Sequence, residues 1–554
     1  MPALHPRDTL TTHAVENMPP HIGDQDLWSA DRPLQEAVQR EGAGWAESKL
    51  ASFGQLIGQA EMFEKADAAN RFTPELKNYD RYGMRIDQVQ FHPAYHDLLS
   101  TAVEHGVHNF AWNEGRSGSH VAHAALTYLI SQVEGGVMCS MAMSYSVFPS
   151  LMTTPALADE WLPRVRSTHY DPRDIPAGEK SGALIGMFMT EKQGGSDVRS
   201  NTTRATPLGA ATGIGAPYAL NGHKFFCSAP MCDAFLTLAY SDGGLSCFLV
   251  PRWRPDGTRN GLNIQRLKDK LGNRSNASSE IELEAAYGVM VGDEGRGVRT
   301  IIDMVQYNRF YCASSSAALI RQALVQATHH VSHRSAFQRR LIDQPLMRNV
   351  LADLALETEA ALALTLRLGR AIDESANSPG AAGFARIGTA IAKYWVCKRA
   401  PAAVGEALEC LGGAGYIEES GLPRLYREAP LNSIWEGSGN VICLDVLRAI
   451  AREPDAMPAV FEELDSALGH DANYDGAVAE LNGMLAEPAD LEFHARRLTE
   501  LLAMTLQGSL LLRHAPAPIA RAFCASRLGA SRGSQYGNLR DSNAVQQIIE
   551  RALQ

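Results

Sequence analysis

Residues 182–292 interrupt a chain whose pattern is otherwise helical. The apolar segments in this region, such as 234–240 and 245–250, are short, and turn signals separate them, including Asn221 followed by Gly222. Short alternating segments with intervening turns favour a small β-barrel or sandwich. We therefore expect a β-domain inserted into a helical protein.

The length of 554 residues exceeds one compact core and suggests about three or four folding units. After the β-region, apolar residues recur with helical spacing over four segments, which suggests an antiparallel bundle. These segments are 298–335, 345–375, 383–411 and 440–451. Pro345 fits the first turn of the second segment, because proline lacks the donor that a first turn leaves unpaired.

The expected fold is thus mainly α with a β-barrel in the middle. The expected domains are an N-terminal helical domain (1–181), the β-barrel (182–292), a four-helix bundle (293–451) and a C-terminal helical extension (452–554).

Composition narrows the functional classes. The net charge of −11 argues against a surface that coats nucleic acid or anionic membrane as a whole, although a local basic patch remains compatible with it. The nine cysteines lack paired spacing and lie in apolar surroundings, so we expect reduced core residues, without disulfides or a metal site. No apolar stretch reaches about 18 residues and no signal peptide is recognisable, which predicts a cytoplasmic protein outside the membrane.

Charge changes sign within the extension. Residues 453–500 hold twelve acidic residues against Arg496 and Arg497, whereas arginines predominate over 513–551. Arginines of this kind contact DNA phosphates without reading sequence. The DNA-binding candidates are Arg513, Arg521, Arg527, Arg532 and Arg540. A solvated helical face paired with the acidic segment explains the same pattern, so both interpretations stay open.

Glu436 stands alone in a glycine-rich turn before an apolar helical run. Glycines allow the backbone to approach a ligand closely, and the free N–H groups of a helix start bind pyrophosphate. Asn440 is the expected N-cap of that helix. We expect a carboxylate next to Trp435 to be partly desolvated, which would raise its pKa and suit it to proton abstraction. The alternative is an ordinary turn residue.

Two further segments are candidates for cofactor contacts. At 187–197 an alternating strand runs into a glycine-rich loop that carries Thr190 and Ser196, for which a plain β-turn is the alternative. Gly412 and Gly413 follow a helix, where a glycine C-cap is sufficient explanation. Taken singly, none of these segments identifies an enzyme.

Taken in order, the segments resemble the acyl-CoA dehydrogenase family across roughly residues 60–450. The ordered set comprises Thr190 with Gly195-Ser196, the strand 221–228, Arg334-x-x-Phe337, Gly412-Gly413 and Trp435-Glu436-Gly437. The resemblance implies an FAD-dependent oxidoreductase in which Glu436 removes the α-proton of an acyl thioester. Arg334 and Phe337 are implied to hold the FAD of a second subunit.

The resemblance also implies a set of cofactor-binding residues. They are Met187, Met189, Thr190, Gly195, Ser196, Phe226, Cys227, Ser228, Arg334, Phe337, Gly412, Gly413, Gly437, Ser438 and Asn440.

Within the family, the chain is most similar to the adaptive-response, AidB-like branch. Four features carry this similarity: residues 80–89, residues 189–198, Trp435-Glu436-Gly-Ser-Gly-Asn440 and the extension. The branch implies an FAD homotetramer of the DNA alkylation response that binds double-stranded DNA nonspecifically and has weak acyl-CoA dehydrogenase activity.

Two alternatives remain. One is a metabolic dehydrogenase for a short or branched acyl-CoA whose extension serves assembly, and the other is a DNA-binding protein with a structural flavin. Gln193, Phe226 and Gln338 depart from the usual pattern of the family, which leaves the substrate open. Arg448 either crowds the acyl pocket or closes a salt bridge.

Overall fold

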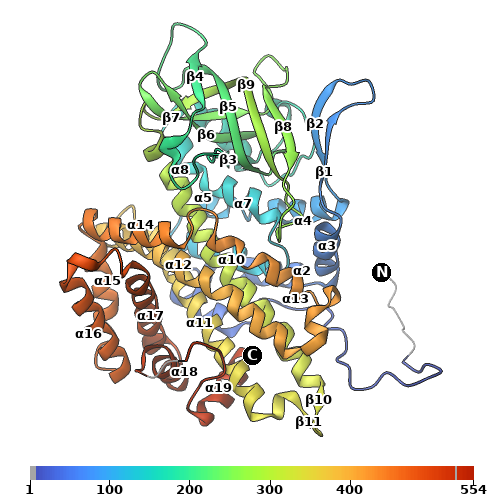
Figure 1. Cartoon of the computed structure of the whole chain (residues 1–554), viewed down its shortest axis with the longest axis vertical. Helices are drawn as coiled ribbons and strands as arrows, with labels where there is room; N and C mark the ends of the chain where they lie inside the picture. Colours follow the sequence, from blue (N-terminus) through green and yellow to red (C-terminus); the bar gives the residue numbers. More distant parts are fainter. Residues whose placement is uncertain (1–7, 531–532, 554) are drawn as a thin grey trace.

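The computed structural model describes residues 8–530 and 533–553. A β-barrel sits at one end of the long axis, the helical bundle lies beneath it, and the last hundred residues pack along the side of the bundle (Figure 1). The fold class predicted from sequence is confirmed. Within the described residues, no helix is long and apolar enough to cross a membrane.

The N-terminal region is helical, with one hairpin that the sequence pattern did not reveal. The hairpin pairs β1 (Glu75–Tyr79) with β2 (Arg85–Gln90) in antiparallel register. The helices are α1 (Arg32–Arg40), α2 (Glu47–Ile57), α3 (Ala60–Arg71), α4 (Pro93–Glu104), α5 (Phe110–Glu114), α6 (Ser119–Ser131), α7 (Val137–Ser146), α8 (Phe148–Met152) and α9 (Pro155–Val165).

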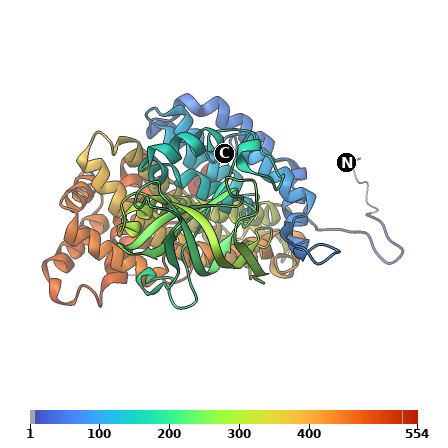
Figure 2. The same ribbon diagram turned by 90° about the horizontal axis from the view of Figure 1, so that it is seen from above.

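Seven strands form the barrel, which faces the viewer in Figure 2. They are β3 (Ile185–Phe188), β4 (Arg204–Pro207), β5 (Pro217–Ser228), β6 (Ala234–Ser241), β7 (Gly244–Pro251), β8 (Leu262–Leu267) and β9 (Ser278–Val291). The order is β3-β6-β4-β5-β9-β7, with β8 on β9, and the pairing of β6 with β7 closes the sheet. Phe188, Phe235 and Phe248 fill its interior, and closure leaves few free edges.

Three long helices and a shorter one make the bundle. They are α10 (Gly297–His333), α11 (Pro345–Glu374), α12 (Pro379–Cys410) and α14 (Gly439–Arg452), with α13 (Leu422–Glu428) before the last. Pro345 does begin α11. A short hairpin of β10 (Ser335–Ala336) and β11 (Arg339–Arg340) joins α10 to α11. All nine cysteines are free and buried, as predicted.

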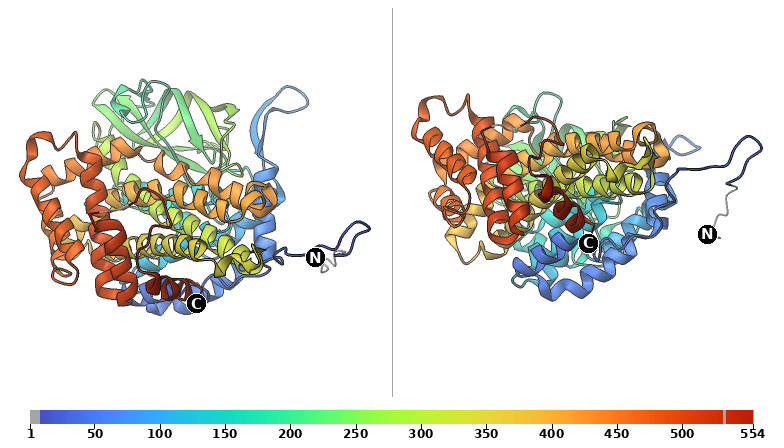
Figure 3. Two further views of the ribbon diagram at one scale, coloured as in Figure 1. Left: turned by 60° about the horizontal axis from the view of Figure 1, so that its bottom comes forward. Right: turned by 90° about the horizontal axis from the view of Figure 1, so that it is seen from below.

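The extension is helical and lies against the bundle, with α17 running beside it and α19 next to the N-terminal helices (Figure 3). Its helices are α15 (Ala456–Asp465), α16 (Ala472–Ala486), α17 (Ala495–His514), α18 (Ala517–Phe523) and α19 (Ser542–Ala552). Leu498, Leu502 and Leu506 of α17 are fully buried. Burial of such side chains is the main force that holds two elements together.

Candidate active site

The loop before α14 holds Glu436 in a strained conformation. Its φ of 58° lies in the left-handed region, which costs a non-glycine residue about 1–2 kcal/mol. Two cations hold the loop from the bundle: Arg309 of α10 donates a 3.0 Å hydrogen bond to the Glu436 carbonyl, and Lys393 of α12 donates to the Gly437 carbonyl. The bundle therefore fixes the backbone that carries the carboxylate.

The Glu436 carboxylate is held in a poorly solvated position. Burial raises its pKa to about 7, and the charges of Arg309 and Lys393 oppose the shift. Among the described residues, no donor lies within hydrogen-bonding distance of the carboxylate oxygens. A carboxyl group that titrates near pH 7 is suited to general-base chemistry.

Three arginines converge on Asp445 of α14. Arg309, Arg386 and Arg448 donate to its carboxylate at 2.8, 2.9 and 3.0 Å. Arg448 thus closes a salt bridge within its own helix and is more than half exposed. Because Asp445 also orients Arg309, it supports the Glu436 loop indirectly.

Residues of the predicted flavin strand and loop gather on one side of the barrel. The Phe225 N–H donates to the Thr190 carbonyl at 2.8 Å, which joins the end of β3 to β5. Phe226 is half exposed and Ser228 partly buried, whereas the Cys227 side chain points into the barrel core. Only the backbone of Cys227 is therefore available to a ligand on this face.

Cys139 of α7 connects this face with Glu436. Burial raises its thiol pKa to about 11; nearby Lys270 and Ser228 lower it, and Glu436 raises it. Lys270 is itself desolvated, which lowers its pKa to about 8, and its ammonium donates to Ser278 Oγ at 3.0 Å. Barrel, N-terminal helices and bundle thus meet around Glu436.

Sequence reasoning missed four polar residues of this junction: Cys139, Lys270, Arg309 and Lys393. Lys393 lies in a helical run that is otherwise apolar or small, which is a recognisable signal, whereas polar residues precede Arg309 and give it no such signal. A charge within a buried helix face needs a partner.

Four predicted cofactor residues lie at the far end of the bundle. The end of α10 at His333 is 24 residues beyond Arg309, which is about 36 Å along a helix. Cys410, at the end of α12, is 17 residues beyond Lys393, or about 26 Å. Arg334 and Phe337, and Gly412 and Gly413, follow these ends. One chain therefore does not bring them to Glu436.

The helix start at 438–440 differs from the prediction. The N-cap of α14 is Ser438, so Asn440 is not the N-cap. The Asn440 side-chain oxygen instead accepts a 2.8 Å hydrogen bond from Arg496 of the extension. The Asn440 side chain, in the first turn of α14, thus links this helix to α17.

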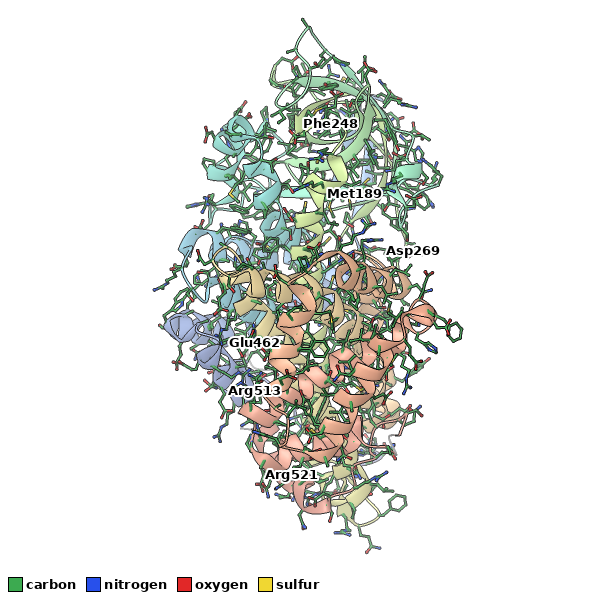
Figure 4. The ribbon with its side chains drawn as sticks, turned by 90° about the vertical axis from the view of Figure 1, so that its left-hand side faces the viewer. Met189, Phe248, Asp269, Glu462, Arg513 and Arg521 are labelled. Carbon is green, nitrogen blue, oxygen red and sulfur yellow. The ribbon has the colours of Figure 1, made fainter. Side chains whose placement is uncertain are left out.

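The predicted DNA-binding arginines separate into two groups. Arg513 pairs with Glu463, and Arg527 pairs with Asp353 and Glu357, so both guanidinium groups lie in internal ion pairs. Arg521 and Arg540 are exposed. Arg532 lies outside the described residues. In Figure 4, Arg513 and Arg521 lie well below Met189 along the long axis.

Three family models match successive parts of the chain. They describe the adaptive response protein AidB N-terminal domain over residues 17–172, the acyl-CoA dehydrogenase middle domain over 186–286, and the acyl-CoA dehydrogenase C-terminal domain over 295–451. The putative acyl-CoA dehydrogenase AidB of Escherichia coli is 47% identical over 515 residues, which cover 93% of this chain and 94% of that protein. The chain belongs to the acyl-CoA dehydrogenase family.

Other relatives agree with this assignment. Acyl-CoA dehydrogenase family member 11 of Caenorhabditis elegans is 30% identical over 88% of this chain and 83% of its own length. The crystal structure of C. elegans ACDH-11 in complex with C11-CoA superimposes with a TM-score of 0.83, covers 95% of each chain and is 26% identical. The enzyme is thus an acyl-CoA dehydrogenase-type oxidoreductase that depends on FAD.

The junction fits a flavin. The hydroxyls of Thr190 and Ser196 have no hydrogen-bond partner in the described part of the chain. A Cβ atom added at Gly195 would lie 3.1 Å from the Thr190 side chain, so a side chain at Gly195 would crowd Thr190. Phe226 supplies an exposed aromatic surface. Hydroxyls and an aromatic side chain on neighbouring strands of the barrel are groups suited to hold a heteroaromatic ring.

Proposed function

We propose that Glu436 is the general base that removes the α-proton of an acyl thioester. Its position supports the role, because a carboxyl group with a pKa of about 7 and no hydrogen-bond donor is half ionised and reactive at neutral pH. FAD, when bound, supplies the acceptor for the hydride that leaves the β-carbon.

The chain's own residues prepare this proton transfer. Arg309 and Lys393 fix the carbonyls of Glu436 and Gly437, so the carboxylate direction is set before substrate binds. The flavin is held by Thr190, Ser196, Phe226 and Ser228 on the barrel side in this proposal. Arg334, Phe337, Gly412 and Gly413 hold the FAD of a neighbouring subunit in a homotetramer.

The test is Glu436→Gln in the FAD-loaded protein. Loss of a general base lowers a rate by about 10²–10⁴, so we expect thioester-dependent bleaching of the flavin to slow by that factor while FAD stays bound. Glu419→Gln, at an exposed carboxylate, is the matched control. Bleaching by Glu436→Gln at the rate of the control would remove Glu436 from the reaction.

We further propose that the protein binds double-stranded DNA nonspecifically and acts in the alkylation response, as an AidB-like protein. The match to the adaptive response protein AidB N-terminal domain supports the role. Arg521 and Arg540 are the contacts that we propose, because both residues lie on the exposed surface of the extension.

Reversing the charge of Arg521 tests the proposed DNA binding. Arg521→Glu in the whole protein should weaken retention of a DNA duplex and lower the slope of log affinity against log salt by about one. Arg81→Glu, in the turn between β1 and β2, is the control, because it makes the same change of charge outside the extension. Equal slopes for the two variants would exclude Arg521 from DNA contact and favour an extension that serves assembly.

A further inference from the structure

A cavity of about 430 Å³ lies where the N-terminal helices meet the barrel. Its walls come from β2, α4, the segment 167–184 and residues 229–233. Sites for small molecules occupy about 300–1,000 Å³ and occur preferentially between domains. The cavity therefore has the size and the place of a ligand site.

The cavity is separate from the Glu436 site. Helix α7 stands between them: its Ser140 lines the cavity, while the adjacent Cys139 interacts electrostatically with Glu436 and Lys270. Neither Glu436 nor any residue predicted to bind flavin lines the cavity. It is thus not part of the site proposed for proton abstraction.

The deep part of the cavity is apolar and partly aromatic. Phe91 and Tyr95 stack with ring centroids 4.1 Å apart and nearly parallel planes, and Leu99 and Val103 continue the wall. Met231 faces them from the barrel. Flat aromatic walls favour a ring that stacks upon them.

The charges around the cavity are already neutralised. Lys180 pairs with Asp233 at 2.7 Å, with both side chains less than 10% exposed, and Arg252 pairs with Asp174 at 2.9 Å. Burial lowers the pKa of His108 to about 4, so this ring is neutral at pH 7. A charged ligand would have to break a buried ion pair, which is strongly unfavourable.

Polar groups at the cavity nevertheless lack partners. The phenol of Tyr95, a residue that lines the cavity and is only 4% exposed, makes no hydrogen bond to the described residues. His108 Nδ1 is a buried atom that has no hydrogen-bond partner there either. Buried polar groups are nearly always hydrogen-bonded. The cavity is open to solvent at its rim, where Gln90, His169 and Pro172 are exposed. A ligand can therefore enter and bond to the polar groups inside.

We propose that this cavity is a second small-molecule site, which takes an uncharged ring compound that carries at least one hydrogen-bonding group. The ring stacks against Tyr95 and Phe91, and its polar group bonds to the Tyr95 phenol. The site stands independently of the role assigned to Glu436.

Isothermal titration of the full-length, FAD-loaded protein with indole tests the proposal, because indole is an uncharged double ring with one N–H donor. We expect saturable binding of one indole per chain. Tyr95→Phe keeps the ring and removes only the hydroxyl, so binding should weaken about two- to tenfold, the usual worth of one neutral hydrogen bond. Tyr82→Phe, at an exposed tyrosine, should leave it unchanged.

A second variant and two competitors complete the test. Val103→Trp fills the deep end and should abolish binding even if Tyr95→Phe has a small effect. Indole-3-acetate, which adds a carboxylate, should bind at least tenfold more weakly. If indole-3-acetate binds as tightly as indole, the cavity does not select uncharged ligands and the proposal is wrong on that point. Displacement of indole by octanoyl-CoA would overturn a separate site, as would binding unaffected by both Tyr95→Phe and Val103→Trp, or no saturable binding.

Discussion

Arg527→Ala should loosen the extension from the bundle, whereas Arg521→Ala, six residues earlier, should not. The Arg527 guanidinium lies 2.5 Å from Asp353 and 3.3 Å from Glu357, which are 1% and 3% exposed. Arg521 is exposed. The same substitution in the same segment therefore removes a buried cation in one variant and a solvated one in the other.

The free energy of unfolding lost in Arg527→Ala depends on the partners that Asp353 and Glu357 keep. At an effective dielectric constant of about 20, a charge pair at these distances attracts by about 5–7 kcal/mol before desolvation is subtracted. Removing one partner of a buried pair costs about 3–5 kcal/mol. Glu357 keeps Arg399 at 2.8 Å, and Asp353 keeps the Gly537 N–H, so we expect about 3 kcal/mol.

Urea unfolding followed by limited proteolysis of the extension measures this difference. With a slope of about 1–3 kcal/mol per molar urea, 3 kcal/mol lowers the midpoint by about 1–3 M. Arg521→Ala should stay within about 0.5 kcal/mol of the unchanged protein. If the two variants release the extension at the same urea concentration, the buried ion pairs do not hold it.

The other predictions concern the active site. In the role proposed for it, Glu436 must be ionised to accept a proton, so the rate of thioester-dependent flavin reduction should rise with pH through about 7. Lys393→Met removes a cation that lowers this pKa, so the pH profile measured by rapid mixing should move up by about one unit. An unmoved profile would contradict the coupling between Lys393 and Glu436. Phe337→Ala, at a side chain 91% exposed in the single chain, should lower FAD retention and the assembled mass in light scattering without moving the pH profile; unchanged retention would contradict cofactor sharing between subunits.

Much of the fold follows from local patterns in the sequence. Alternation and turn signals located the barrel, and the helical spacing located α10, α11, α12 and α14 to within a few residues. The β1–β2 hairpin was not predicted, because Glu75–Tyr79 and Arg85–Gln90 are mostly polar and only partly buried. A strand without a clean apolar face gives little signal.

The site was predictable in part. The order of the motifs was enough to predict Glu436 and the glycine-rich segments as site residues, since these lie within short stretches of sequence. The supporting groups did not follow, because Arg309 is 127 residues from the carbonyl that it holds and Lys393 is 44 from its own. The internal ion pairs of Arg513 and Arg527 could not be predicted either, because their acidic partners lie 50 and 174 residues away.

The contact between Arg551 of α19 and Glu36 of α1, at 2.6 Å, joins residues separated by 515 positions. At about 5–20 residues per second, a ribosome takes about half a minute to two minutes to make the intervening chain. The α11 surface that receives Val545 and Ile548 is uncovered only in the last part of that time, after α11 itself has been made. Until α19 emerges, the growing chain therefore displays an apolar surface beside the Glu359 carboxylate.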